Sequence, residues 1–132
     1  LISCSLLLGL KKMNAQSDLN SRFSNMYWGI YSRSSNSLDK VDTMILKNVP
    51  NVASLTHYPY LGGFIFYDNG NFKEINKKHC GSDRDGYKGN WILQHDTIIV
   101  RISETSIIWY FRILHQKPGN LIVKYWMKKN EG

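Results

Sequence analysis

Regular alternation of apolar and polar side chains toward the C-terminal end is the feature that most restricts how this chain can fold. Over residues 97–127, three short segments separated by turn sequences place an apolar or aromatic side chain at every second position. This face collects Ile98, Val100, Ile102, Ile107, Trp109, Phe111, Ile113, Leu121, Val123, Tyr125 and Met127. The opposite face carries Arg101, Arg112 and Lys124, which we interpret as solvated charges that protect sheet edges. A period of two predicts antiparallel strands with one buried and one solvated face.

A hairpin is predicted around Asn69-Gly70. This pair joins two aromatic and β-branched runs, Phe64–Tyr67 and Phe72–Ile75, and both of its residues tolerate a positive φ angle. The pattern of residues 32–59 is less decisive. It is compatible with a short helix or with further strands, and we favour strands. The predicted fold is all-β, an antiparallel up-and-down meander that forms a barrel or half-barrel over about residues 20–130.

Length and composition fit one small domain. The chain has 132 residues, of which 42% are hydrophobic and 20% are charged, which is enough apolar surface for a core and argues against a mainly disordered chain. Length and composition therefore argue against multidomain enzymes, coiled coils and disulfide-dense scaffolds. No apolar run approaches the roughly 20 residues that a helix needs to cross a bilayer. We assign residues 17–132 to a single β domain.

Residues 1–16 have the features of an export signal. Leu1–Leu10 is an apolar run of the length found in signal peptides, and a polar run follows at residues 17–21. We interpret residues 1–16 as the remnant of an export signal and expect an extracytoplasmic protein, either secreted, periplasmic or lipid-anchored to the cell envelope. The alternative is a short N-terminal strand or helix packed on the domain.

Two processing routes remain open for this segment. Residues 1–4 are similar to a bacterial lipobox, in which Cys4 would be lipidated. Ordinary cleavage near Ala15-Gln16 is the route that we favour slightly. Cys80 would then be a lone thiol, although one long-range disulfide is possible if both cysteines are retained.

Residues with catalytic or metal-binding chemistry are scattered. The four histidines, His57, His79, His95 and His115, lack the spacing of a zinc site. No phosphate-binding loop and no nucleophile-elbow motif occurs. We therefore predict a non-catalytic protein without a metal ion or other cofactor.

Residues 60–127 resemble the small bacterial lipocalin-like domains. The resemblance rests on the Asn69-Gly70 hairpin, the polar loop that contains Cys80, the Gly89-Asn90-Trp91 strand and the β-branched strand after it. Residues 27–29 fit a first strand. The resemblance implies a lipocalin-like barrel.

The inner face of the predicted barrel defines a candidate ligand site. Its walls would be formed by Trp91, Val100, Trp109, Phe111, Val123 and Tyr125. Apolar and aromatic walls suit a small apolar ligand. The alternative is that the same side chains fill the barrel and leave a structural or interaction domain.

The net charge of +7 raises a third and less favoured reading. Basic residues interleaved with aromatic ones also describe oligonucleotide-binding barrels, and the candidate basic patch consists of Lys73, Lys77, Lys78, Arg84 and Lys88. Since an exported chain rarely meets nucleic acid, we expect none as a partner. The same charge suits association with a cell-envelope or membrane surface. The oligomeric state is left open.

Overall fold

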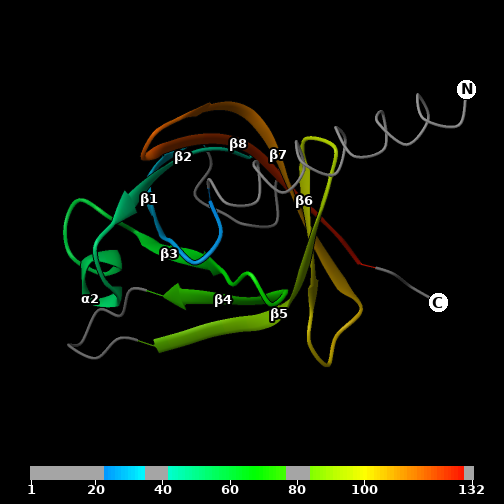
Figure 1. Ribbon diagram of the computed structural model, residues 1–132. Coiled ribbons are helices and arrows are strands. Elements are labelled where there is room, and N and C mark those ends of the chain that lie inside the picture. The colour runs from blue at the N-terminus through cyan, green and yellow to red at the C-terminus, as the bar shows by residue number, and fades with distance from the viewer. Residues whose placement is uncertain (1–22, 35–41, 77–83, 130–132) are drawn as a thin grey trace, which may run out of the picture.

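The computed structural model describes residues 23–34, 42–76 and 84–129. Eight antiparallel strands close into a barrel in the order β1-β2-β8-β7-β6-β5-β4-β3 (Figure 1). The strands are β1 (Tyr27–Arg33), β2 (Asp42–Val49), β3 (Gly62–Phe66), β4 (Asn71–Asn76), β5 (Arg84–Gln94), β6 (Thr97–Ile102), β7 (Ile107–Lys117) and β8 (Asn120–Lys129). The predicted all-β, antiparallel up-and-down barrel is confirmed, and it is closed rather than a half-barrel.

The strand order shows how the barrel closes. Strands β3 to β8 form a continuous meander in which each strand pairs with the next. The β1–β2 hairpin fills the remaining gap, because β2 pairs with β8 and β1 pairs with β3. In the barrel, β1 is flanked by β2 and β3. The segment of chain that connects β2 to β3 must therefore pass over β1.

Residues 50–61 make this crossing and contain the short helix α2 (Val52–Leu55). Asn51 caps the helix, because its side-chain oxygen accepts a hydrogen bond from the backbone N–H of Ser54 at 2.9 Å. Leu55 is buried against Val49, Ile65 and Ile75 in a small second core. The predicted preference for strands in residues 32–59 is therefore right for β2, whereas a single turn of helix lies in the crossover.

Two glycines allow the crossover to lie close to the barrel wall. Gly29 on β1 and Gly63 on β3 are register partners. A Cβ atom on Gly29 would lie 2.5 Å from the ring of Tyr60, and one on Gly63 would lie 2.6 Å from the side chain of Leu55 and would overlap the Trp28 carbonyl oxygen. Both positions therefore need glycine for close packing.

The barrel interior is filled by a core cluster in which most aromatic rings meet edge to face or at a tilt. The centroid of the Phe111 ring lies 5.1 Å from that of Phe64, 5.2 Å from that of Tyr125 and 5.8 Å from that of Phe66. Such pairs add to the stabilisation that burial alone provides. No helix among the described residues is long and apolar enough to cross a membrane.

Phe23 packs into the barrel interior near one end. Its side chain is fully buried, and its ring packs at 5.7 Å from Phe66 and 5.3 Å from Trp91. Its carbonyl oxygen accepts a hydrogen bond from Trp28 Nε1 at 2.8 Å. The segment between Phe23 and β1 therefore lies at the end of the barrel where the β3–β4 hairpin turns.

Candidate functional site

All six residues predicted to line a ligand cavity belong to the interior core cluster. Between 0% and 6% of each residue is exposed to solvent. The residues are Trp91, Val100, Trp109, Phe111, Val123 and Tyr125. None of the six lines either of the two cavities described below, of about 540 Å³ and about 300 Å³. The structure thus brings the predicted set together, but as packed side chains.

Trp91 has a structural role in the Gly-x-Trp segment. Its indole Nε1 donates a hydrogen bond to the Tyr67 carbonyl oxygen at 2.7 Å, and its backbone N–H donates to Gly70 at 2.9 Å. Two residues earlier, a Cβ atom on Gly89 would overlap the carbonyl oxygen of Arg101. The segment therefore ties β5 to the β3–β4 turn and lets β5 approach β6 closely.

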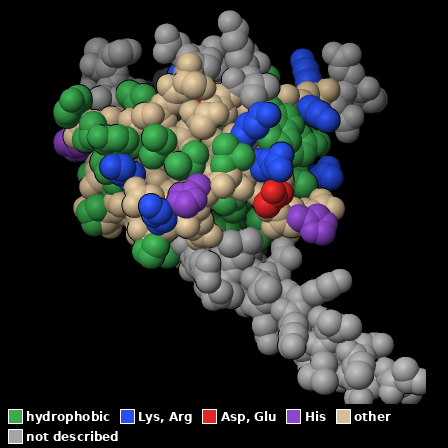
Figure 2. Space-filling model, turned by 90° about the horizontal axis from the view of Figure 1, so that it is seen from above, with side chains coloured by type: hydrophobic (Ala, Val, Ile, Leu, Met, Phe, Trp, Pro, Cys, Tyr) green, Lys and Arg blue, Asp and Glu red, His purple; other side chains and the backbone are tan. Residues whose placement is uncertain are grey.

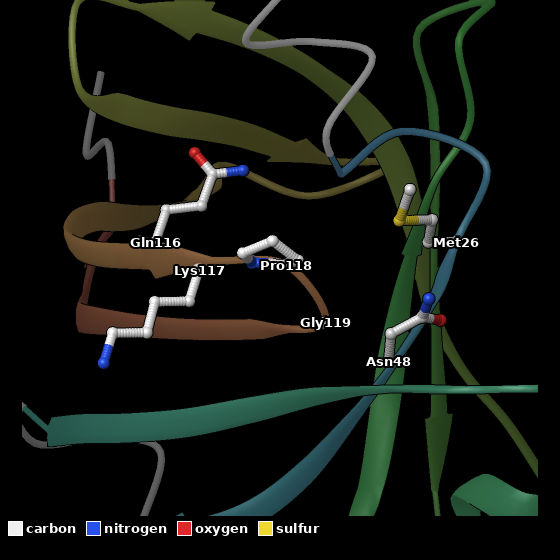
Figure 3. Close-up of a pocket in the computed structure, with 6 residues that line it drawn as sticks. All are labelled: Met26, Asn48, Gln116, Lys117, Pro118 and Gly119. Carbon is white, nitrogen blue, oxygen red and sulfur yellow. The ribbon is translucent and has the colours of Figure 1, made fainter.

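A cavity of about 540 Å³ opens at the barrel end that contains the β7–β8 turn (Figure 3). We call it the mouth pocket. Its walls are formed by Met26, Asn48, Gln116, Lys117, Pro118 and Gly119. Its volume falls within the range of about 300–1,000 Å³ that is usual for small-molecule sites.

Strand register aims two amide side chains into the mouth pocket. Asn48 is the register partner of inward-facing Trp28, and Gln116 is the partner of buried Leu121. Directly opposed residues on antiparallel strands share a face. In Figure 3, Gln116 and Asn48 stand on different walls, whereas the ammonium group of Lys117 points away from Met26 and Asn48.

A β-bulge at Leu114 decides which residue of β7 enters the pocket. Ile113 pairs with Val123, but His115 pairs with Ile122, so Leu114 is an extra residue on β7. Uninterrupted alternation from Phe111 would have turned His115 inward instead of Gln116. A one-residue bulge moves every side chain beyond it to the opposite face of the sheet. Sequence reasoning missed this site because alternation alone does not locate a bulge.

The walls of the mouth pocket combine two kinds of surface. Asn48 and Gln116 offer neutral donors and acceptors, while the Met26 thioether, Pro118 and the aliphatic stem of Lys117 offer apolar area. Among the described residues that line the pocket, Lys117 is the only one with a titratable side chain. These residues can orient a small, partly apolar molecule, but they include no acid–base pair.

A buried carboxylate, Glu74, lies toward the other end of the barrel. Glu74 is the register partner of buried Phe64, and only 4% of it is exposed. Burial raises the pKa of Glu74 above its ordinary value of 4.5, while a hydrogen bond from the Tyr87 backbone N–H, at 3.2 Å, acts in the opposite direction. A Cβ atom on Gly86 would overlap this carboxyl group, so a larger residue there would require the Glu74 side chain to move.

Replacement of Glu74 by glutamine should stabilise the protein at neutral pH but not in acid. A raised pKa means that the folded state binds the proton more tightly than the unfolded chain. The carboxylate therefore lowers stability as the pH rises from below 4.5 through the folded-state pKa. Urea unfolding of Glu74→Gln and wild type at neutral pH and below pH 4.5 measures the difference. Glu104→Gln, at an exposed position, is the control. A Glu74→Gln variant that is less stable at neutral pH would contradict this account.

Other residues considered in the sequence analysis do not form a site among the described residues. No group of three or more His, Cys, Asp or Glu side chains in residues 23–34, 42–76 and 84–129 is placed to hold a metal ion. His57 Nδ1 lies 2.6 Å from the Ala53 carbonyl oxygen, and His95 and His115 are exposed. The predicted lipidation site at Cys4, together with His79 and Cys80, lies outside the described residues.

The predicted basic patch is described only in part. Lys73 and Lys88 are register partners on β4 and β5 and line a surface cavity of about 300 Å³. Lys77, Lys78 and the side chain of Arg84 lie outside the description. The described side chains therefore include only two members of the predicted patch, Lys73 and Lys88.

Comparison of the chain with protein-family models, curated proteins and solved structures finds no match. The resemblance to lipocalin-like domains therefore stays a prediction from the sequence motifs. What the structure shows is the closed antiparallel barrel.

Proposed function

We propose that this protein is a non-catalytic, extracytoplasmic lipocalin-like domain that binds a small, partly apolar ligand. The observation that carries the proposal is the mouth pocket of about 540 Å³, into which register turns Asn48 and Gln116. Compared with the sequence prediction, the binding site moves from the interior to the barrel end. The extracytoplasmic location rests on the sequence of residues 1–16.

A structural or interaction domain is the second candidate function. It is favoured by the interior packing, in which the buried ring of Trp109 meets those of Phe72 and Tyr125, each at 5.8 Å. A barrel filled in this way needs no ligand for stability. The two functions differ in whether the mouth pocket binds a small molecule.

Fluorescence titration with 1-anilinonaphthalene-8-sulfonate, an amphipathic probe, tests the proposal. Gln116→Trp places an indole in the mouth pocket and should weaken probe binding by about tenfold, equivalent to about 1.4 kcal/mol. His115→Trp adds the same indole to the neighbouring residue, whose register partner is Ile122 rather than buried Leu121. This control should stay close to wild type.

Near-UV circular dichroism must show that both variants are folded, because the probe also binds partly unfolded proteins. Equal weakening by the two substitutions, or no binding to folded wild type, would contradict the mouth-pocket proposal. The second candidate function would then be favoured.

A further inference from the structure

An apolar row crosses the outer surface of four neighbouring strands. Register aligns Ile92 on β5 with Ile99 on β6, Ile99 with Tyr110 on β7, and Tyr110 with Trp126 on β8. Ile92 is 58% exposed, and the other three residues are half-buried. The rings of Tyr110 and Trp126 stack with their centroids 5.1 Å apart and their planes 4° apart. We call these four residues the outer row.

Basic residues border the outer row on both sides. Along the strands, Arg101 and Lys128 lie on one side of it, and Arg112 and Lys124 lie on the other. The Lys128 ammonium nitrogen is 5.7 Å from the centroid of the Tyr110 ring. The residues of β6, β7 and β8 include no Asp or Glu.

Among the basic residues beside the row, Arg112 forms an ion pair with Asp96 at 3.3 Å. Both side chains are about half exposed, so this pair offsets the local charge only weakly. Figure 2 shows the molecule from the side on which β7 and β8 arch in Figure 1. On this side, many basic side chains lie among hydrophobic ones, and few acidic side chains are visible. The surface as a whole is therefore cationic with an apolar centre.

We propose that this face docks on the surface of an anionic lipid bilayer. Trp and Tyr favour the membrane–water interface because they combine an apolar body with a polar group. Lys and Arg can lay their aliphatic stems along the apolar row while their charges meet lipid headgroups. Each basic residue near an anionic membrane adds to the attraction and strengthens binding by about fivefold. The outer row lies on the barrel wall, so this proposal is independent of the mouth pocket.

The ring geometry favours a membrane over single-stranded nucleic acid. Nucleic-acid barrels use open aromatic faces on which bases stack. Tyr110 and Trp126 instead cover one face of each other, and Lys128 lies over the Tyr110 ring. The adjoining Ile92 and Ile99 offer no ring for stacking, but they add apolar area that the bilayer interface would bury.

A fluorophore attached at the outer row tests the contact directly. In a Cys4→Ser/Cys80→Ser background, Ile92→Cys would carry an environment-sensitive dye, and Val52→Cys on α2, also exposed, would carry it as the control. With vesicles of phosphatidylcholine and phosphatidylglycerol, we expect a blue shift at position 92 and little change at position 52. Because both proteins keep residues 1–16, membrane binding through that segment alone would not favour position 92.

Charge reversal tests the electrostatic part of the proposal. Lys124→Glu/Lys128→Glu should weaken the vesicle-dependent signal at position 92 by at least about 30-fold, because two attractive charges are lost and two repulsive ones are added. Lys47→Glu/Lys73→Glu makes the same change of charge on β2 and β4 and should have less than about a twofold effect. Raising the salt from about 0.1 M to about 1 M should also weaken binding, because it shortens the Debye length from about 10 Å to about 3 Å.

Three results would overturn the proposal. One is an equal response of the two dye positions to anionic vesicles. Another is an unchanged signal after Lys124→Glu/Lys128→Glu. The third is binding of a single-stranded oligonucleotide that this double substitution abolishes, with no response to vesicles at position 92.

Discussion

Replacement of Phe111 by alanine should lower the free energy of unfolding by about 4 kcal/mol. Phe111 is fully buried, and its ring lies between 5.1 and 6.4 Å, centroid to centroid, from those of Phe64, Tyr125, Phe66 and Trp109. Truncation would remove these contacts and leave a cavity that the closed barrel cannot collapse to fill. Urea unfolding monitored by far-UV circular dichroism measures the loss.

Tyr110→Ala is the matched control for this prediction. Tyr110 is the next aromatic residue on the same strand, but it faces outward and is half-buried, so its truncation should cost about 1 kcal/mol. Losses of similar size for the two variants would mean that the interior is not packed as described.

Replacement of Gly63 by alanine should lower the free energy of unfolding by about 3 kcal/mol. The added methyl group would overlap the Trp28 carbonyl oxygen on β1 and press against Leu55 of the crossover. The carbonyl is part of the barrel wall, so the strands or the crossover must shift to accept the methyl group.

Gly29→Ala provides a graded comparison. The three atoms nearest its added methyl group all belong to the ring of Tyr60 in the crossover, and a half-buried side chain can move more easily than backbone. We therefore expect Gly29→Ala to cost less than Gly63→Ala in the same urea experiment. A neutral effect of Gly63→Ala would contradict the close packing of residues 50–61 on the barrel.

Local sequence signals were sufficient to predict the strands and much of the core. Alternation over residues 97–113 correctly placed Val100 and Trp109 inside, since each residue faces opposite to the next along an unbroken strand. The predicted hairpin at Asn69-Gly70 is confirmed, with Gly70 at a φ angle of 93°. These features depend on neighbouring residues only.

Features that depend on distant contacts were not predictable from the sequence. Extra residues at Tyr31 and Leu114 shift the register of β1 and β7, and neither position carries a local signal for a bulge. The passage of residues 50–61 over β1 depends on the Gly29–Gly63 pair, whose members are far apart in sequence.

The buried inner face of the barrel was predicted from the sequence, but the mouth pocket was not. The inward facing of Trp91 and Phe111 follows from strand alternation, but alternation says nothing about whether the enclosed space is empty. That space is filled by rings from distant segments, such as those of Phe23 and Phe64. Asn48 and Gln116 line the mouth pocket through register, so the site could be found only once the strands were paired.

Nuclear magnetic resonance of the ¹³C-labelled protein, titrated with 1-anilinonaphthalene-8-sulfonate, is the most direct test of where a ligand binds. We expect the largest shifts at the methyl group of Met26, which lines the mouth pocket, and little change at the methyl groups of fully buried Val100 and Val123. The largest shifts at Val100 and Val123, with Met26 unchanged, would place the ligand in the barrel interior and contradict the account.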